Sequence, residues 1–318
     1  MRVVSLLPSA TEILFALGFD QEVVGVSHEC DFPAQARAKR VVIHSRLPHD
    51  AAPSEIDRLV REYVSRGESL YMVDAEALEE LAPDLIITQD LCRVCAASPD
   101  DLAATLARFR NPPEVLCLNP QDLGDVWRDI LWVGEATCRG HEAEDLLKKI
   151  GMRLGELERQ LTSVERRPRV AILEWLQPFY VAGHWVPEMI EIAGGEDVLG
   201  RKRTPSFRVS AKEVMEAAPE ILLIAQCGYS AKQAREEYSA ITFPEEWSAI
   251  PAVRNGQVYA LDASGYFSRP GPRLVSGIEA LAKILHPGIA VSPEAGGVAI
   301  PITSPVTAFP ATLRAATA

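Results

Sequence analysis

Residues 122–161 read DLGDVWRDILWVGEATCRGHEAEDLLKKIGMRLGELERQL. Apolar residues recur in this stretch at intervals of three and four positions, the spacing of one helix face, and charged residues fill the opposite face. No proline interrupts it, although Gly140 weakens its middle and allows either two helices or one kinked helix. The pattern predicts one long central helix joining two α/β lobes, with a ligand cleft between the lobes. A long helix inside one large domain is the alternative.

The chain of 318 residues is long enough for two domains of ordinary size. Strand-like and helix-like segments alternate on both sides of the central stretch, which predicts a Rossmann-like lobe with a mostly parallel sheet on each side. We expect an N-terminal lobe over 1–121, a linking helix over 122–165, a C-terminal lobe over 166–287 and a disordered tail over 288–318. The tail is expected because its sequence is rich in Ala, Pro, Thr, Ser and Gly.

Short apolar runs bounded by turn residues locate the expected strands, and amphipathic segments locate the helices. Strands are expected at 3–7, 23–26, 41–43, 85–88, 115–118, 169–174, 221–225 and 257–261. Helices are expected at 10–17, 53–65, 75–81, 100–109, 189–192, 211–217 and 272–285. Ser9 with Glu12, and Ser210 with Glu213, match the capping-box pattern at helix starts. The likeness of APDLII at 82–87 to APEILLI at 218–224 indicates a weak internal symmetry.

Composition excludes several classes of protein. The net charge of −12 argues against a nucleic-acid partner, because phosphate binding needs a concentrated basic surface. The short basic runs at 166–169 and 201–203 are interpreted as solvated loops. No run approaches about 18 uncharged apolar residues, so we expect no membrane-spanning helix. We also expect a monomer.

The N-terminus weakly resembles a signal peptide, since Arg2 precedes an apolar run. Glu12 interrupts that run and no small-residue cleavage site follows, so we interpret residues 3–7 as the first strand of the fold. The expected location is therefore cytoplasmic. A leader missing from this start would instead make the protein periplasmic.

Polar and aromatic side chains follow several predicted strands. Because the carboxyl ends of parallel strands meet at one edge of a sheet, where ligands bind, these residues are the candidate ligand contacts. Aromatic side chains at strand ends suit a large flat ligand, although core packing is the alternative for each of them. The candidates are Ser9, His28, Glu29, Asp90, Trp175, His184, Trp185, Gln226, Tyr229, Tyr266 and Phe267.

Six cysteines occur, and Cys92 and Cys95 form a C-x-x-C pair. That spacing suits two thiolates on one metal ion or a redox dithiol. Cys30 and Cys227 also follow strands, so the four thiols could bind zinc or an iron–sulfur cluster, while buried free thiols are the alternative. We expect no required cofactor and no catalytic residues, because the sequence has no nucleophile elbow, phosphate loop or dinucleotide fingerprint.

Several stretches resemble a known family. VSLLPSATEIL at 4–14 followed by Leu17-Gly18, together with PDLI at 83–86, AGG at 193–195 and IPAVRNGQVY at 250–259, resembles the substrate-binding proteins of cobalamin and iron-siderophore ABC transporters. The resemblance covers roughly residues 2–287, and its nearest branch is cobalamin-binding. It implies a class III periplasmic binding protein fold that binds a corrinoid, or a similar large metal-chelate ligand, in the cleft between the lobes without catalysis.

The same resemblance implies an ABC permease as partner, which acidic residues on the lobe tops would contact. By position the candidates are Glu76, Glu79, Glu80, Glu213 and Glu216. Two other hypotheses are an intracellular metal or iron–sulfur protein that uses the cleft cysteines and a cytosolic enzyme on the same fold, since a fold does not fix function.

Overall fold

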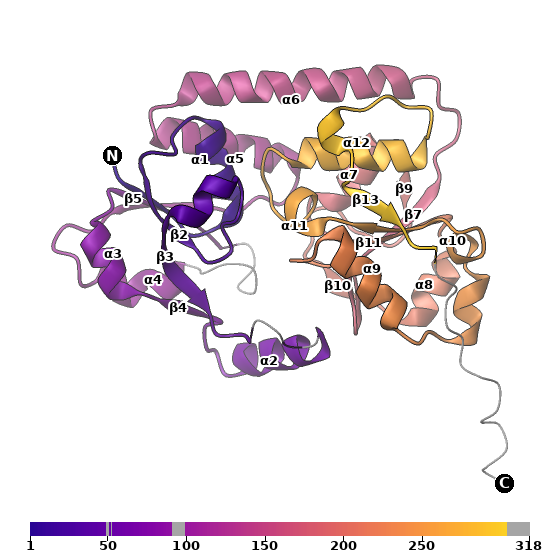
Figure 1. Cartoon of the computed structure of the whole chain (residues 1–318), viewed down its shortest axis with the longest axis horizontal. Coiled ribbons are helices and arrows are strands. Elements are labelled where there is room, and N and C mark those ends of the chain that lie inside the picture. The colour runs from indigo at the N-terminus through magenta and orange to yellow at the C-terminus, as the bar shows by residue number, and fades with distance from the viewer. Residues whose placement is uncertain (49–50, 52, 91–98, 304–318) are drawn as a thin grey trace, which may run out of the picture. The chain divides into compact units, whose positions relative to one another are not determined.

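The computed structural model describes residues 1–48, 51, 53–90 and 99–303 (Figure 1). The chain divides into two compact units, each built around its own sheet. The first unit comprises Met1–Met152 and Pro270–Pro272, and the second comprises Arg153–Arg269 and Arg273–Ala318. The predicted α/β class with two mostly parallel sheets is confirmed.

The first unit contains a six-stranded sheet of order β4-β3-β2-β1-β5-β6. Every pairing in it is parallel except that of the edge strand β4, which is antiparallel to β3. The sequence analysis missed β4. The strands are β1 (Val3–Ser5), β2 (Val23–Ser27), β3 (Arg40–Ser45), β4 (Tyr71–Val73), β5 (Leu85–Gln89) and β6 (Glu114–Leu118).

Helices cover both faces of this sheet, and an apolar core lies beneath them. Helices α1 and α5 pack on each other, while α3 contacts β2 and β3 and α4 contacts β4. Figure 1 shows α1 and α5 on one side of the sheet and α3 and α4 on the other. The helices are α1 (Pro8–Ala16), the 3-10 turn η1 (Ala34–Ala38), α2 (Pro53–Ser65), α3 (Ala75–Leu81), α4 (Pro99–Leu106) and α5 (Leu123–Ala136).

The expected capping box at Ser9 is wrong. Helix α1 begins at Pro8 with Leu7 as its N-cap, and no side chain caps it. Proline suits the first helical position because its fixed φ is already helical and its missing N–H would have had no partner there. Ser9 therefore lies inside the first turn and is only 2% exposed.

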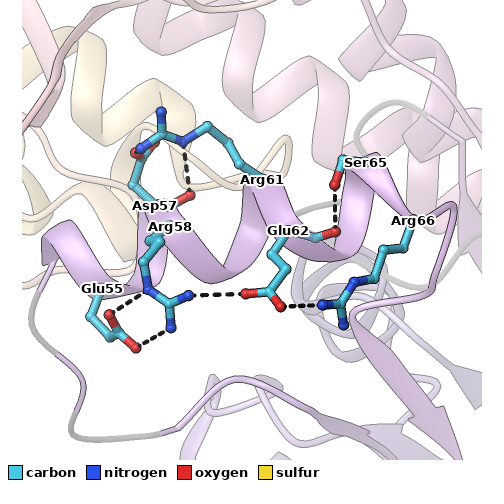
Figure 2. A network of polar contacts seen from close by, with 7 residues as sticks. All are labelled: Glu55, Asp57, Arg58, Arg61, Glu62, Ser65 and Arg66. Atoms are coloured by element: carbon cyan, nitrogen blue, oxygen red, sulfur yellow. Dashed lines mark hydrogen bonds and ion pairs between the residues drawn. The ribbon is translucent and has the colours of Figure 1, made fainter.

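The predicted helix at 53–65 is confirmed as α2, whose outer face carries a ladder of ion pairs (Figure 2). Arg58 lies between Glu55 and Glu62, with N–O distances of 2.7 Å and 2.9 Å, and Arg66 contacts the other side of Glu62 at 2.6 Å. These spacings of three and four residues place the charges on one face of the helix. All four side chains are at least one-third exposed, so the ladder contributes little to stability.

The central stretch forms two helices, α5 and α6 (Gly140–Leu161), rather than one. Cys138 adopts a left-handed φ of +56° between them, and the N–H of Arg139 donates to the carbonyl of Gly134 at 2.6 Å. A Cβ on Gly134 would approach the Cβ of Ala143 to 2.6 Å, so the glycine lets the two helices meet closely. The division between the two units falls within α6.

The second unit contains a sheet of order β10-β8-β7-β11-β12-β13, in which β9 also pairs with β7. Strands β9, β7, β11 and β12 are parallel, and β8, β10 and β13 run antiparallel to their neighbours. The sequence analysis missed β8, β9, β10 and β13. The strands are β7 (Arg169–Leu176), β8 (Phe179–Val181), β9 (Glu196–Asp197), β10 (Phe207–Arg208), β11 (Ile221–Ile224), β12 (Val258–Leu261) and β13 (Ala299–Pro301).

Helices of the second unit enclose a core that includes Trp247 and Phe243. The predicted capping box of α8 is confirmed, since Ser210 and Glu213 exchange both hydrogen bonds. Helix α9 was not predicted. The helices are α7 (Val186–Ile192), α8 (Ala211–Ala217), α9 (Ala231–Ala240), η2 (Glu245–Ala249), α10 (Pro251–Arg254), α11 (Ala263–Tyr266), α12 (Leu274–Leu285) and η3 (Pro293–Ala295).

The expected disordered tail is wrong for residues 288–303. This segment contains η3 and β13, which pairs antiparallel with β12. Polar contacts also hold it, because Gln160 of α6 exchanges hydrogen bonds with the backbone of Ala290 at 2.9 Å and 3.2 Å. Composition did not show that β12 offers an open edge to this strand. Residues 304–318 lie outside the described residues.

The two units repeat one arrangement at the amino ends of their sheets, which agrees with the weak symmetry in the sequence. The backbone N–H of Arg2 donates to Asp84 at 2.7 Å, and that of Arg169 donates to Glu220 at 3.0 Å. Each arginine side chain also donates to a carbonyl in the last turn of the neighbouring helix, α3 or α8. An alanine with positive φ ends both helices.

Candidate functional site

The ends of β7 and β11 lie side by side in the second unit. Leu173 pairs with Ile224 in the parallel register, and beyond them the N–H of Cys227 donates to the carbonyl of Glu174 at 3.3 Å. The next residues along each strand, Trp175 and Gln226, are therefore neighbours. The structure thus brings together two candidate residues that are 51 positions apart in the sequence.

Tyr229 joins this edge through a tight turn. Its N–H donates to the carbonyl of Gln226 at 3.0 Å, and Gly228 supplies the positive φ of +81° that the turn requires. The Tyr229 ring meets the Trp175 ring edge-to-face, with centroids 5.9 Å apart and an interplanar angle of 73°. Burial raises the pKa of the Tyr229 hydroxyl, and the charge of Glu237 adds to the effect. The phenol therefore stays neutral at physiological pH.

Several polar atoms at this edge have no partner among the described residues. Gln226 is fully buried, and neither its amide oxygen nor its amide nitrogen makes a hydrogen bond. The buried indole N–H of Trp175 is likewise unpaired. Glu174 contrasts with them, because its carboxylate accepts a hydrogen bond from the hydroxyl of Ser206. A buried polar group without a partner is uncommon and is a candidate for ligand contact.

His184 and Trp185 stack on each other before α7, with ring centroids 5.6 Å apart. His184 has a φ of +50°, held by a hydrogen bond from its N–H to the carbonyl of Thr204 at 2.7 Å. Its Nδ1 is buried and has no hydrogen-bond partner within the described ranges. Burial lowers the pKa of His184, so the ring is neutral at physiological pH. The indole N–H of Trp185 donates to the carbonyl of Phe267 at 2.8 Å.

Trp185 and Phe267 are 4% and 2% exposed, so the structure places them in the core of the second unit. Tyr266, at the end of α11, is half-buried and lies under the guanidinium of Arg273, 5.2 Å from its ring centroid. The carbonyl of Tyr229 accepts from the N–H of Ala263 at 3.1 Å, which ties α11 to the turn. The candidate stretches of this unit are therefore linked by direct contacts.

In the first unit, Cys30 lies beneath the carboxyl edge of the sheet and is 3% exposed. The hydroxyl of Thr11 lies 2.8 Å from that of Ser5 and 3.1 Å from the sulfur of Cys30. The Cys30 thiol in turn lies 4.0 Å from the carbonyl of Ser5. This thiol is therefore part of a buried polar network between β1 and α1.

His28 is half-buried after β2, and its Nδ1 lies 3.1 Å from the carbonyl of Ile43. Its Nε2 is 3.8 Å from the exposed carboxylate of Glu29. A pocket of about 270 Å³ opens beside it, lined also by Cys30 and Arg37. Asp90, the remaining candidate of this unit, follows β5 and is exposed.

The four thiols predicted to bind a metal are not seen together. Cys92 and Cys95 lie outside the described residues. Cys30 is in the first unit, while Cys227 is an exposed residue of the second. In the described part of the chain, no three His, Cys, Asp or Glu side chains are arranged to hold a metal ion. A zinc or iron–sulfur site stays a prediction.

The sequence analysis missed Asp129, a buried carboxyl on α5 that is 2% exposed. Burial raises its pKa to about 7, and the nearby charge of Asp125 adds to the effect. Asp129 also raises the pKa of the Cys117 thiol on β6, after the larger effect of burial. The helical spacing could have indicated this burial, because position 129 falls on the apolar face that Val126 and Val133 define.

Two α/β units with aromatic and unpaired polar groups at a carboxyl edge define a protein that binds small molecules. The profile of the family described as periplasmic binding protein matches residues 3–264. The chain therefore belongs to the periplasmic binding protein family, a family of substrate-binding proteins.

Relatives agree with this assignment. An uncharacterised ABC transporter substrate-binding lipoprotein of Bacillus subtilis is 24% identical over 293 residues, which cover 90% of this chain and 80% of the relative. A vitamin B12-binding protein of Vibrio cholerae is 23% identical over 298 residues, with coverages of 89% and 88%.

Solved structures show the same fold. The periplasmic vitamin B12-binding protein of Vibrio cholerae matches with a TM-score of 0.65 and 23% identity, over 89% of this chain and 96% of that one. A periplasmic heme-binding protein of Pseudomonas aeruginosa matches with a TM-score of 0.68 and 18% identity, over 91% and 95%.

The expected cytoplasmic location is wrong. The matching family is one of periplasmic binding proteins, and the Bacillus subtilis relative is a lipoprotein. The features of residues 2–12 that led to the expectation describe the first strand and helix of the fold, and they carry no information about location. None of the helices within the described ranges is long and apolar enough to span a membrane.

Proposed function

We propose that the protein binds a corrinoid, using residues at the carboxyl edge of the sheet in the second unit. The observation that carries the proposal is the pair formed by Trp175 and Tyr229 beside the unpaired amide of Gln226. Aromatic side chains at a strand edge give a large flat ligand an apolar surface, and amide groups give its rim hydrogen bonds. Relatives named as vitamin B12-binding proteins support the same ligand class.

Heme is the second candidate, because heme-binding proteins are among the solved structures of this fold. Both ligands are flat tetrapyrrole-type macrocycles, but their rims differ. Heme carries two carboxylates, whereas a corrinoid carries mainly uncharged amides. The pKa of His184 is lowered by burial, so this histidine would not supply a positive charge for a carboxylate.

An ABC permease is the proposed partner, contacted through the equivalent helices α3 and α8. Among the acidic candidates there, Glu213 is hydrogen-bonded to Ser210 in the capping box of α8. Glu79 forms an ion pair with Arg108, with 2.5 Å between Oε1 and Nε. Glu76, Glu80 and Glu216 are exposed on these helices, although Glu216 lies 3.5 Å from Lys212. We propose that these three carboxylates make the contact, since exposed acidic groups can pair with a basic partner surface.

The test is a titration of anaerobically purified, metal-analysed protein with hydroxocobalamin and, separately, with hemin. We expect saturable one-to-one binding of hydroxocobalamin at micromolar affinity or tighter. The variant Trp175→Ala should weaken binding roughly 5- to 150-fold, because stacking of a flat ring on an aromatic side chain contributes about 1–3 kcal/mol. Trp132→Ala is the matched control, since Trp132 is 42% exposed on α5, away from the strand ends.

Tight binding of hemin without binding of hydroxocobalamin would replace the corrinoid by heme. Binding of neither, in protein that contains stoichiometric zinc or iron, would favour a metal site at the predicted thiols. If Trp132→Ala and Trp175→Ala weaken binding equally, the aromatic pair at the β7 and β11 edge is not the contact surface.

A further inference from the structure

Gln226 is a fully buried amide whose oxygen and nitrogen make no hydrogen bond with any of the residues that the structure describes. Its nitrogen can donate two hydrogen bonds and its oxygen can accept. Leaving such atoms unpaired inside a protein costs free energy, about 1–3 kcal/mol for each group. Because both atoms lack partners, the conclusion holds whichever way the amide is oriented.

The surroundings of Gln226 indicate the kind of group that would pair with it. Its neighbour Trp175 adds an unpaired N–H, which is a donor only. A ligand carboxylate could accept hydrogen bonds from the amide nitrogen of Gln226 and from the indole nitrogen of Trp175. However, it would place negative charge against the amide oxygen of Gln226 and leave that oxygen unpaired. A carboxamide both donates and accepts, so it can pair with both ends of the Gln226 amide and still accept from Trp175.

The turn at Gln226–Tyr229 explains how a ligand could reach this amide. Cys227 and Gly228 at its tip are exposed, and Tyr229 is half-buried. The turn backbone is fixed, because the carbonyl of Tyr229 accepts from Ala263 and Ser264 at 3.1 Å and 3.3 Å. A ligand would therefore reach the amide by displacing side chains rather than backbone, and partly exposed side chains such as that of Tyr229 change rotamer rapidly.

We propose that Gln226 selects ligands by pairing with a carboxamide on the rim of the macrocycle, with Trp175 as the second donor. This inference rests on the proposed function and narrows it to amide-bearing corrinoids. Without a partner, the buried Gln226 amide lowers the stability of the fold. Such a loss of stability is expected where a binding site is preorganised.

The test uses Gln226→Met, which keeps the length of the side chain and removes its polar atoms. In the ligand-free state this variant should melt at the same temperature as the unchanged protein or higher, because an unpaired amide is replaced by an apolar group. The matched control is Gln21→Met, at an exposed position before β2. Marked destabilisation or unfolding of Gln226→Met alone would show that the amide already has a partner and would overturn the inference.

The ligand measurement compares cobinamide, which carries amides, with cobyrinic acid, which has the same ring and carries carboxylates. The unchanged protein should prefer cobinamide, and Gln226→Met should lose at least tenfold of that preference while Gln21→Met keeps it. An unchanged preference in Gln226→Met overturns the role of Gln226 and leaves corrinoid binding intact. Failure of the unchanged protein to bind either corrinoid overturns the proposed function itself, and the inference with it.

Discussion

At the scale of single residues, Asp129 combines burial with a titration near neutral pH. Its pKa in the folded protein is about 7, raised by burial and by Asp125, whereas an unfolded aspartate titrates near 3.9. The folded state therefore holds a proton that the unfolded state has lost throughout this interval. Stability from this group is complete below about pH 4 and is lost as the pH rises toward 7.

We predict that Asp129→Asn removes the decrease in the free energy of unfolding that Asp129 causes as the pH rises. Between about pH 4 and 7 the group contributes a slope of about −1.4 kcal/mol per pH unit to the free energy of unfolding. The Asn variant should therefore be more stable than the unchanged protein at pH 8, with a smaller difference at pH 5. Urea unfolding at the two pH values measures this. The control is Asp145→Asn, at an exposed position of α6, and an equal pH dependence in all three proteins would contradict the prediction.

Residue types and their places at strand ends predicted that Trp175, Gln226 and Tyr229 lie at one sheet edge, and the structure brings them together there. Their contact with a ligand stays a prediction. Residue types and places were not enough to separate contact residues from core residues. Trp185 and Phe267 have the same sequence signature, yet the hydrogen bond between them lies in the core. That distinction depends on packing between segments 82 positions apart, which no local pattern contains.

At the scale of elements, helix prediction succeeded where amphipathic spacing and caps agreed. Helices α2, α3 and α8 have the predicted bounds, and the side chain of Asp74 caps α3. The missed strands β4, β8, β9, β10 and β13 are two or three residues long. Such strands contain too few residues to show an alternating pattern, and they form because an existing strand offers an open edge.

A largely buried ion pair helps to anchor the second half of α6 to its unit. Arg153 donates to both oxygens of Glu279 on α12, at 3.0 Å and 2.7 Å, and to the hydroxyls of Ser276 and Ser292. The side chain of Glu279 is 7% exposed and that of Arg153 is 30% exposed. Removing the arginine would leave a buried carboxylate without its main counter-charge.

We predict that Arg153→Met lowers the free energy of unfolding by about 2–3 kcal/mol, because it leaves the buried carboxylate of Glu279 without its counter-charge. The double variant Arg153→Met/Glu279→Gln should recover part of the loss. The comparison is Arg58→Met in the exposed ladder of Figure 2. Water screens these ion pairs, so we expect their removal to change the free energy of unfolding little. Chemical denaturation measures all three, and equal losses at Arg153 and Arg58 would show that burial does not determine the strength of these pairs.

At the scale of the whole molecule, charge and internal repetition bear on ligand choice. A net charge of −12 repels anionic ligands at long range, which favours a corrinoid with uncharged amides over a molecule with several carboxylates. The repeated arrangement of Arg2 with Asp84 and of Arg169 with Glu220 places strands β1 and β7 equivalently in their units. The two units therefore share this local scaffold and differ in the residues that follow their strands.

The extent of the folded chain is itself testable, since composition predicted that order ends near residue 287 and the structure places a strand after it. Val298 and Ile302 are 1% and 5% exposed, and β13 pairs with β12 from Ala299 to Pro301.

We predict that a chain ending at Leu285-His286-Pro287 melts roughly 10 °C below a chain ending at Thr303. The shorter chain lacks both buried aliphatic side chains and so loses about 3–6 kcal/mol of stabilisation from their burial. Each kcal/mol shifts the melting temperature of a protein of this size by about 2–4 °C. Differential scanning calorimetry of the two chains decides the matter, because both lack residues 304–318 and differ only in the segment at issue. Identical melting temperatures would mean that β13 adds nothing to the stability of the second unit and that composition located the end of the fold correctly.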